Sequence, residues 1–166
     1  MSNTNQPLLE TGQTIPDFTL PGADGMPHSP WDYKQRQHLI LLFIRSSSSS
    51  ETQGLLHAFA QHYSTFREEE CSILAISPDT VIANLHTQEE LHLPFPLLAD
   101  PKGEVISRYT QWDATAGILK PSIVLADRYT VLITMFKVSS PGTTEPGEPV
   151  EKIISHLFDI LANSLS

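Results

Sequence analysis

The segment Leu39-Ile-Leu-Leu-Phe-Ile44, followed after one arginine by the serine run Ser46–Ser50, decides how this chain folds. Six consecutive apolar residues bounded by polar ones are typical of a strand that is covered on both faces. Beyond the serines, apolar residues such as Leu55 and Phe59 recur at the spacing of one face of an amphipathic helix. The segment therefore predicts a buried strand, a polar turn and a helix over 51–67.

The expected start of that helix carries two overlapping capping signals. Ser48-x-x-Glu51 and Ser50-x-x-Gln53 both fit a capping box, in which a serine and an acidic or amide side chain satisfy each other's backbone donors. Further along, Ser72–Ile76 reads as a second buried strand, and Asp79 or Thr80 can cap a second helix that runs to about Leu91.

The remaining elements complete an α/β pattern. A strand–helix–strand order implies a parallel pair, and a later hairpin adds an antiparallel pair, so we expect a central mixed β-sheet flanked by helices in three layers. The other expected elements are a short strand at Asp17–Leu20 with a turn at Asp24-Gly25, a short helix at Glu104–Tyr109, hairpin strands at Ser122–Ala126 and Val131–Lys137, and a C-terminal helix that contains Ile153 and Leu161.

Length and composition restrict the function. A chain of 166 residues fits a single domain over 1–166, with a loose N-terminal arm at 1–11 and a Pro/Gly-rich loop at 139–149 before the last helix. The net charge of −9, without a basic stripe, argues against nucleic acid as a partner. The longest apolar run is far too short to cross a membrane, and no signal peptide is recognisable, so we expect a cytoplasmic protein.

Five segments carry a family resemblance, in the right order along the chain. They are Gly12–Pro21 (GQTIPDFTLP), Asp24-Gly25 with Trp31-Asp32-Tyr33, Ile73–Asp79 (ILAISPD), Phe95–Glu104 (FPLLADPKGE) and Pro121–Asp127 (PSIVLAD). Together they resemble the peroxiredoxin-like (AhpC/TSA, redoxin) family of the thioredoxin-fold superfamily. The resemblance implies a thioredoxin-like fold and a thiol-dependent antioxidant oxidoreductase activity.

The chain departs from the family where the reactive cysteine should be. The family motif P-x-x-x-T-x-x-C, or R-x-x-x-C-x-x-C in a related branch, aligns with Arg45, Ser49 and Thr52. Peroxide reduction needs a thiolate that passes through a sulfenic acid, which a hydroxyl cannot form. We therefore expect a family member that is not itself an active peroxidase. The alternative is a non-catalytic thioredoxin-fold module that binds another molecule.

The resemblance implies two further features near Lys120-Pro121. The resemblance places an arginine just before the penultimate strand, and here Lys120 stands in that region. Thioredoxin-fold proteins often carry a cis-proline near this place, so the resemblance raises Pro121 as a cis-proline candidate.

Other residues receive plainer interpretations. Cys71, the single cysteine, is expected to be buried and structural, and its acidic neighbours Glu68–Glu70 would raise its pKa. The serine run is expected to end in a helix cap; a small anion held by the helix start and Arg45 is the less favoured reading. The seven histidines lack metal-ligand spacing, so no metal and no cofactor is expected. A protein partner and a homodimer both stay open.

Overall fold

A five-stranded mixed sheet forms the centre of the molecule in the computed structural model, which describes residues 9–113, 115, 117–118, 120–139 and 147–164. The strand order is β5-β4-β3-β8-β9, with the first three strands parallel and the other two antiparallel to their neighbours. The expected mixed sheet is confirmed. Its strands are β3 (His38–Phe43), β4 (Cys71–Ser77), β5 (Leu97–Ala99), β8 (Ser122–Ala126) and β9 (Leu132–Lys137).

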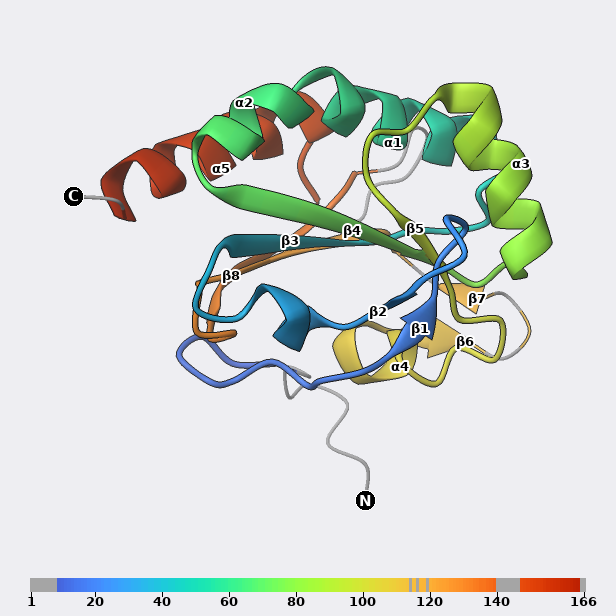
Figure 1. The fold of residues 1–166 in the computed structure, drawn as a ribbon, viewed down its shortest axis with the longest axis horizontal. Helices are drawn as coiled ribbons and strands as arrows, with labels where there is room; N and C mark the ends of the chain where they lie inside the picture. Colours follow the sequence, from blue (N-terminus) through green and yellow to red (C-terminus); the bar gives the residue numbers. More distant parts are fainter. Residues whose placement is uncertain (1–8, 114, 116, 119, 140–146, 165–166) are drawn as a thin grey trace.

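Helices and loops cover both faces of this sheet, which gives three layers (Figure 1). Side chains alternate along β3, so Ile40 and Leu42 pack into one apolar cluster while Leu41 and Phe43 pack into the other. The first cluster includes side chains of α1 (Ser50–Gln61), α2 (Tyr63–Glu68) and α5 (Val150–Ser164), and the second those of α4 (Ile106–Tyr109). The helix α3 (Val81–Leu91) contacts the edge strand β5.

The helix expected over 51–67 is two helices in the structure. The chain interrupts the regular pattern at His62, whose backbone N–H donates to the carbonyl of Phe59, three residues back rather than four. Phe59 and Phe66 are nevertheless both fully buried and stacked, with ring centroids 5.9 Å apart. The apolar periodicity therefore indicated the correct buried face but did not reveal the break.

The expected strand at Asp17–Leu20 is also shifted. Only Leu20–Pro21 forms a strand, β1, which pairs antiparallel with β2 (Pro27–His28) around the expected turn, where Gly25 has a φ of +83°. Four short strands were not expected: β2, β5, β6 (Trp112–Asp113) and β7 (Gly117–Ile118). Two or three residues are too few to show a period of two, and prolines surround β5.

The second helix, the short helix, the hairpin and the C-terminal helix lie where the sequence placed them, to within about two residues. The arm over 1–11 and the loop over 139–149 fall largely outside the described residues. Within the loop's described part, the Ser139 N–H donates to the Glu148 carbonyl at 2.8 Å. Nowhere in the described ranges is a helix long and apolar enough to span a bilayer.

Candidate functional site

The candidate site lies where β3 ends and α1 begins. Ser49 is the N-cap of α1, and its extended backbone (φ −76°, ψ 144°) lets its side chain turn back onto the helix. The Ser49 hydroxyl accepts a hydrogen bond from the Thr52 N–H at 3.1 Å and donates to Thr52 Oγ1 at 2.9 Å. The cap is therefore Ser49, one residue away from either capping box expected from the sequence.

The carboxylate of Asp79, in the loop after β4, holds the serine run in place. It accepts from the Ser47 N–H at 2.6 Å and from the Ser46 hydroxyl at 3.2 Å. Thr87 on α3 donates to Ser47 Oγ at 3.0 Å, and Ser47 is almost fully buried. The turn is thus a fixed structure rather than a free polar loop, and it sets where α1 starts.

This role of Asp79 was missed, because the sequence suggested it only as a helix cap. Thr80 is the cap of α3, and its hydroxyl accepts from the Ala83 N–H at 3.2 Å. The available signal was topological: β3 and β4 are parallel neighbours, so the loops at their carboxyl ends must meet. Asp79, just after β4, and the serine run, just after β3, are therefore brought together.

Arg45, just after β3, forms an ion pair with Glu51 in the first turn of α1. Its Nη1 lies 3.8 Å from Glu51 Oε2, and both side chains are more than a third exposed. A surface pair of this kind contributes little to stability, but it places a negative charge beside the arginine. This negative charge opposes the binding of an anion at the start of α1.

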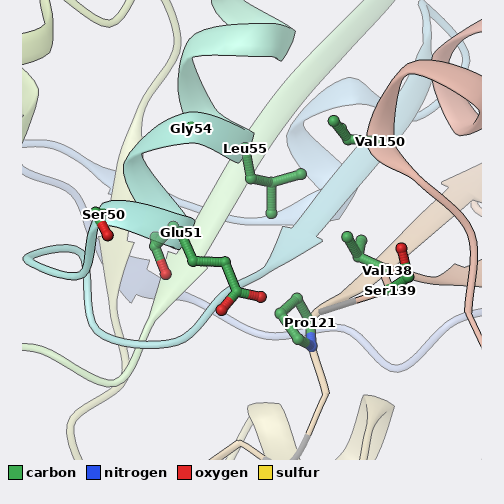
Figure 2. Close-up of a pocket in the computed structure, with 9 residues that line it drawn as sticks. Ser50, Glu51, Gly54, Leu55, Pro121, Val138, Ser139 and Val150 are labelled. Carbon is green, nitrogen blue, oxygen red and sulfur yellow. The ribbon is translucent and has the colours of Figure 1, made fainter. Parts of the chain in front are cut away.

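A cavity of about 350 Å³ opens beside the first turn of α1. Its walls are mainly apolar, and Figure 2 shows the Glu51 side chain extending from α1 toward Pro121. Thr52 lines the cavity and is only 3% exposed, whereas Arg45 and Ser49 are not among the lining residues. The residues around it are Ser50, Glu51, Thr52, Gly54, Leu55, Pro121, Val138, Ser139 and Val150.

Pro121 lies at this cavity, but it is not a cis-proline. No peptide bond among the described residues is cis, and these residues include Lys120 and Pro121. The trans form is the ordinary state of an X-Pro bond, and the Pro121 carbonyl here accepts from the Val138 N–H at 3.0 Å. The proline position is thus retained beside the site, while the cis geometry suggested by the resemblance is wrong for this structure.

Cys71 lies outside the cavity, at the start of β4. It is fully buried, and burial raises the pKa of its thiol far above the ordinary value, although Arg67 acts in the opposite direction. The expectation of a buried thiol is confirmed, but the expected cause was wrong: desolvation dominates, and Glu70 instead lies 3.6 Å from Arg128. Burial and a raised pKa both make a thiol less reactive than a free cysteine at neutral pH.

Within the portion of the chain that the structure describes, no three His, Cys, Asp or Glu side chains come close enough to hold a metal ion together.

A mixed sheet of this order, with helices on both of its faces (Figure 1), is the thioredoxin-like arrangement. The AhpC/TSA family model matches residues 11–135, so the chain belongs to the AhpC/TSA family. Alkyl hydroperoxide reductase E of Mycobacterium tuberculosis is 27% identical over 137 residues, which cover 81% of this chain and 89% of the relative.

Solved structures of this class confirm the fold. The peroxidoxin BcpB of Mycobacterium tuberculosis superposes with a TM-score of 0.79 at 20% identity, covering 93% of this chain and 97% of that one. A cysteine-to-serine mutant of PrxQ from Xylella fastidiosa superposes with a TM-score of 0.77 at 17% identity, covering 91% and 96%. The thioredoxin-like architecture expected from the sequence is therefore correct.

Proposed function

We propose that this chain is a peroxiredoxin-like protein that has kept the architecture of the family's site and lost its peroxidase chemistry. The observation that carries the proposal is the hydroxyl of Thr52. By the family motif it stands at the reactive cysteine position, in the first turn of α1 and beside the cavity. A threonine hydroxyl has no accessible anion near neutral pH and no sulfenic acid state, so it cannot accept an oxygen atom from a peroxide.

The surroundings of Thr52 support the same proposal. In a working site, a helix start and a nearby cation lower the pKa of the thiol. Here the carboxylate of Glu51 lies 3.8 Å from Arg45, and its negative charge opposes stabilisation of an anion by the arginine. The Ser49 hydroxyl donates to the Thr52 hydroxyl and accepts from the Thr52 N–H, so the groups that hydrogen-bond here are uncharged.

Cys71 offers no replacement thiol. It is fully buried on the sheet, and the pKa of its thiol is raised by desolvation. A relocated redox centre would need an exposed thiol of lowered pKa. The function that remains is the binding of a small molecule. The cavity of about 350 Å³ has mainly apolar walls with some hydroxyl groups, and its volume is within the size range of small-molecule sites.

Trapping of sulfenic acid with dimedone tests the proposal. Wild type, Cys71→Ser and Thr52→Cys are treated with hydrogen peroxide and dimedone, and the intact masses are measured. We expect an adduct only on Thr52→Cys. A stoichiometric adduct on the native wild-type protein, absent from Cys71→Ser, would show that the chain carries a working redox thiol and would contradict the proposal.

A further inference from the structure

The hydroxyl of Thr52 lies at the cavity beside α1 and has a proton that it does not use within the protein. Its oxygen accepts from the Ser49 hydroxyl at 2.9 Å, so its own proton points elsewhere. In the part of the chain that the structure describes, no group accepts that proton, although Thr52 is only 3% exposed. A buried donor without an acceptor costs free energy, and an acceptor atom of a ligand in the cavity removes that cost.

The other walls of the cavity favour an apolar ligand. Four of its lining residues have hydrocarbon side chains, and Figure 2 shows them around one space: Leu55 on α1, Pro121 and Val138 next to strands of the sheet, and Val150 at the start of α5. The volume of about 350 Å³ lies at the lower end of the range for small-molecule sites. The ligand is therefore small, with a hydrocarbon body and few polar atoms.

Glu51 places a negative charge at the same cavity. Its side chain extends toward Pro121 (Figure 2), and none of the described residues that line the cavity is Lys, Arg or His. Arg45 lies 3.8 Å from this carboxylate but does not line the cavity, so the carboxylate is the charged group that borders a ligand. The start of a helix favours anions, and an acidic side chain in the first turn opposes that effect. An anionic ligand is therefore repelled by Glu51.

We propose that the cavity binds a neutral, mainly apolar molecule that carries a carbonyl oxygen, and that Glu51 excludes carboxylates. The ligand's oxygen accepts from the Thr52 hydroxyl, and its hydrocarbon part lies against Leu55 and Val138. This ligand class rests on the binding role proposed above. Its test measures binding and not redox chemistry, so a dimedone adduct on wild type would refute the loss of peroxidase chemistry without deciding which ligand the cavity takes.

Cyclohexyl methyl ketone and cyclohexanecarboxylate test this selectivity, because they share a ring and a carbonyl group and differ in charge. Each is titrated at neutral pH into the full chain with isotopically labelled methyl groups, and the methyl signals are followed by NMR. We expect the ketone to shift the signals of Leu55, Val138 and Val150, with a dissociation constant in the millimolar range because a small ligand makes few contacts. The carboxylate should bind at least about tenfold more weakly, since it meets Glu51 and also loses hydration in an apolar cavity.

Two pairs of variants separate the hydrogen bond from the charge. Thr52→Val removes the donor and keeps the shape, so it should weaken binding of the ketone about threefold to tenfold, whereas Thr52→Ser keeps the hydroxyl and should bind as wild type does. Glu51→Gln should strengthen binding of the carboxylate by about threefold or more and leave that of the ketone unchanged. Glu68→Gln, on α2 and outside the cavity, should change neither. Circular dichroism of each variant confirms folding.

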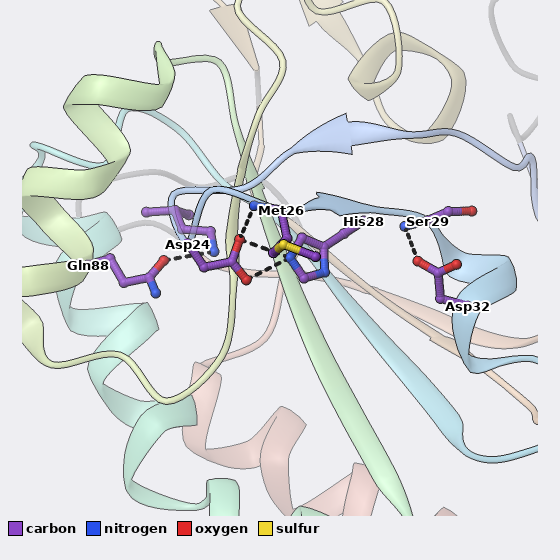
Figure 3. Close-up of polar contacts among 7 residues, drawn as sticks. Asp24, Met26, His28, Ser29, Asp32 and Gln88 are labelled. Carbon is purple, nitrogen blue, oxygen red and sulfur yellow. Dashed lines mark hydrogen bonds and ion pairs between the residues drawn. The ribbon is translucent and has the colours of Figure 1, made fainter.

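A second concave surface provides the control for non-specific binding of an apolar probe. Met26 lines a groove of about 450 Å³ at the β1–β2 hairpin. The hairpin turn is held by the Asp24 carboxylate, which accepts from the Met26 N–H and lies 2.8 Å from His28 Nε2 (Figure 3). The methyl signal of Met26 should not shift with either probe.

Three results would overturn the proposal. The first is a ketone that shifts no methyl signal of the cavity at millimolar concentration, or that shifts Met26 equally. The second is equal binding of the ketone to wild type and Thr52→Val, because the hydroxyl would then not hold the ligand. The third is equal binding of the carboxylate to wild type and Glu51→Gln, or an equal gain in Glu68→Gln, because Glu51 would then not select by charge.

Discussion

The hydroxyl of Ser49 lies 2.9 Å from the hydroxyl of Thr52 and 3.1 Å from the backbone nitrogen of the same residue. One side chain thus caps α1 and at the same time donates to the hydroxyl of Thr52, which with Ser49 aligns with the cysteine positions of the family motif. These two hydrogen bonds are neutral, and the Asp79 carboxylate fixes the preceding turn, so the geometry can persist without any thiolate to stabilise.

The first prediction concerns this cap. Ser49→Ala removes the acceptor for the Thr52 N–H, and we expect it to lower the free energy of unfolding by about 1 kcal/mol. Ser50→Ala, one residue further along, should change it by less than about 0.5 kcal/mol, since an exposed serine without a capping bond contributes little. Urea denaturation of both variants measures the difference, and equal losses would contradict the assignment of Ser49 as the cap.

The second prediction uses Gly54, which lies in α1 and lines the cavity. A Cβ added at Gly54 would find no atom within 4 Å, so Gly54→Ala should raise the free energy of unfolding by about 0.5–1 kcal/mol through helix propensity. Gly103→Ala is the contrasting variant, because Gly103 has a φ of +69° and its Cβ would lie 2.4 Å from Trp112. We expect a lower melting temperature for Gly103→Ala and a higher one for Gly54→Ala.

The third prediction concerns His38, which is almost fully buried at the start of β3. Burial lowers the pKa of its imidazole below the ordinary value of 6.5, with Arg128 acting in the same direction and Asp127 and Glu70 opposing it. The unfolded chain therefore takes up this proton at a higher pH than the folded chain. Stability present above pH 6.5 is then lost as the pH falls from 6.5 toward the lower pKa of the folded state.

Denaturation at several pH values measures this loss. Wild type should lose more of its free energy of unfolding between pH 7.5 and 5.5 than His38→Gln does, because the substituted side chain takes up no proton. Parallel curves for the two proteins would show that His38 does not titrate differently on folding.

The fourth prediction concerns an anion at the start of α1. Because Glu51 lies beside Arg45, we expect phosphate to raise the melting temperature of wild type and Arg45→Ala by the same amount. Comparing variants in one buffer removes the general stabilisation that phosphate gives by exclusion from the protein surface. A phosphate response that Arg45→Ala abolishes would assign an anion to the site.

Elements whose cause lies in neighbouring residues could be predicted from the sequence, whereas elements that depend on contacts between distant segments could not. The run Leu39–Ile44 predicted β3 correctly because burial on both faces leaves an uninterrupted apolar pattern. The three-residue strand β5 left no such pattern, and its pairing with β4 is decided by long-range contacts. Likewise, the break at His62 changes one hydrogen bond without disturbing the apolar face.

The site shows the same division. The motif spacing placed Thr52 at the start of the helix after β3, and in the structure Thr52 and Pro121 line one cavity. The choice among Ser48, Ser49 and Ser50 as the cap could not be made from sequence, because all three are serines and Asp79 fixes the turn from a distant segment. The bond before Pro121 has the ordinary trans form, although the resemblance raised it as a cis candidate.

The fifth prediction is that Thr52→Cys, in a Cys71→Ser background, introduces a thiol of lowered pKa. The first-turn N–H groups of α1 and the Ser49 hydroxyl would stabilise the thiolate. Monobromobimane labelling across pH should give a half-point below the free-cysteine value of roughly 8.5. Adding Ser49→Ala should raise that half-point, and a value at or above 8.5 without it would contradict the site geometry.

The turnover of hydrogen peroxide with dithiothreitol as the reductant tests the central claim most directly. The rate is compared between wild type and Cys71→Ser at equal enzyme concentration, with Thr52→Cys as the positive control. The loss of the reactive thiol predicts equal rates for the first two proteins, both at the level of the uncatalysed reaction. A wild-type rate well above that of Cys71→Ser would contradict it.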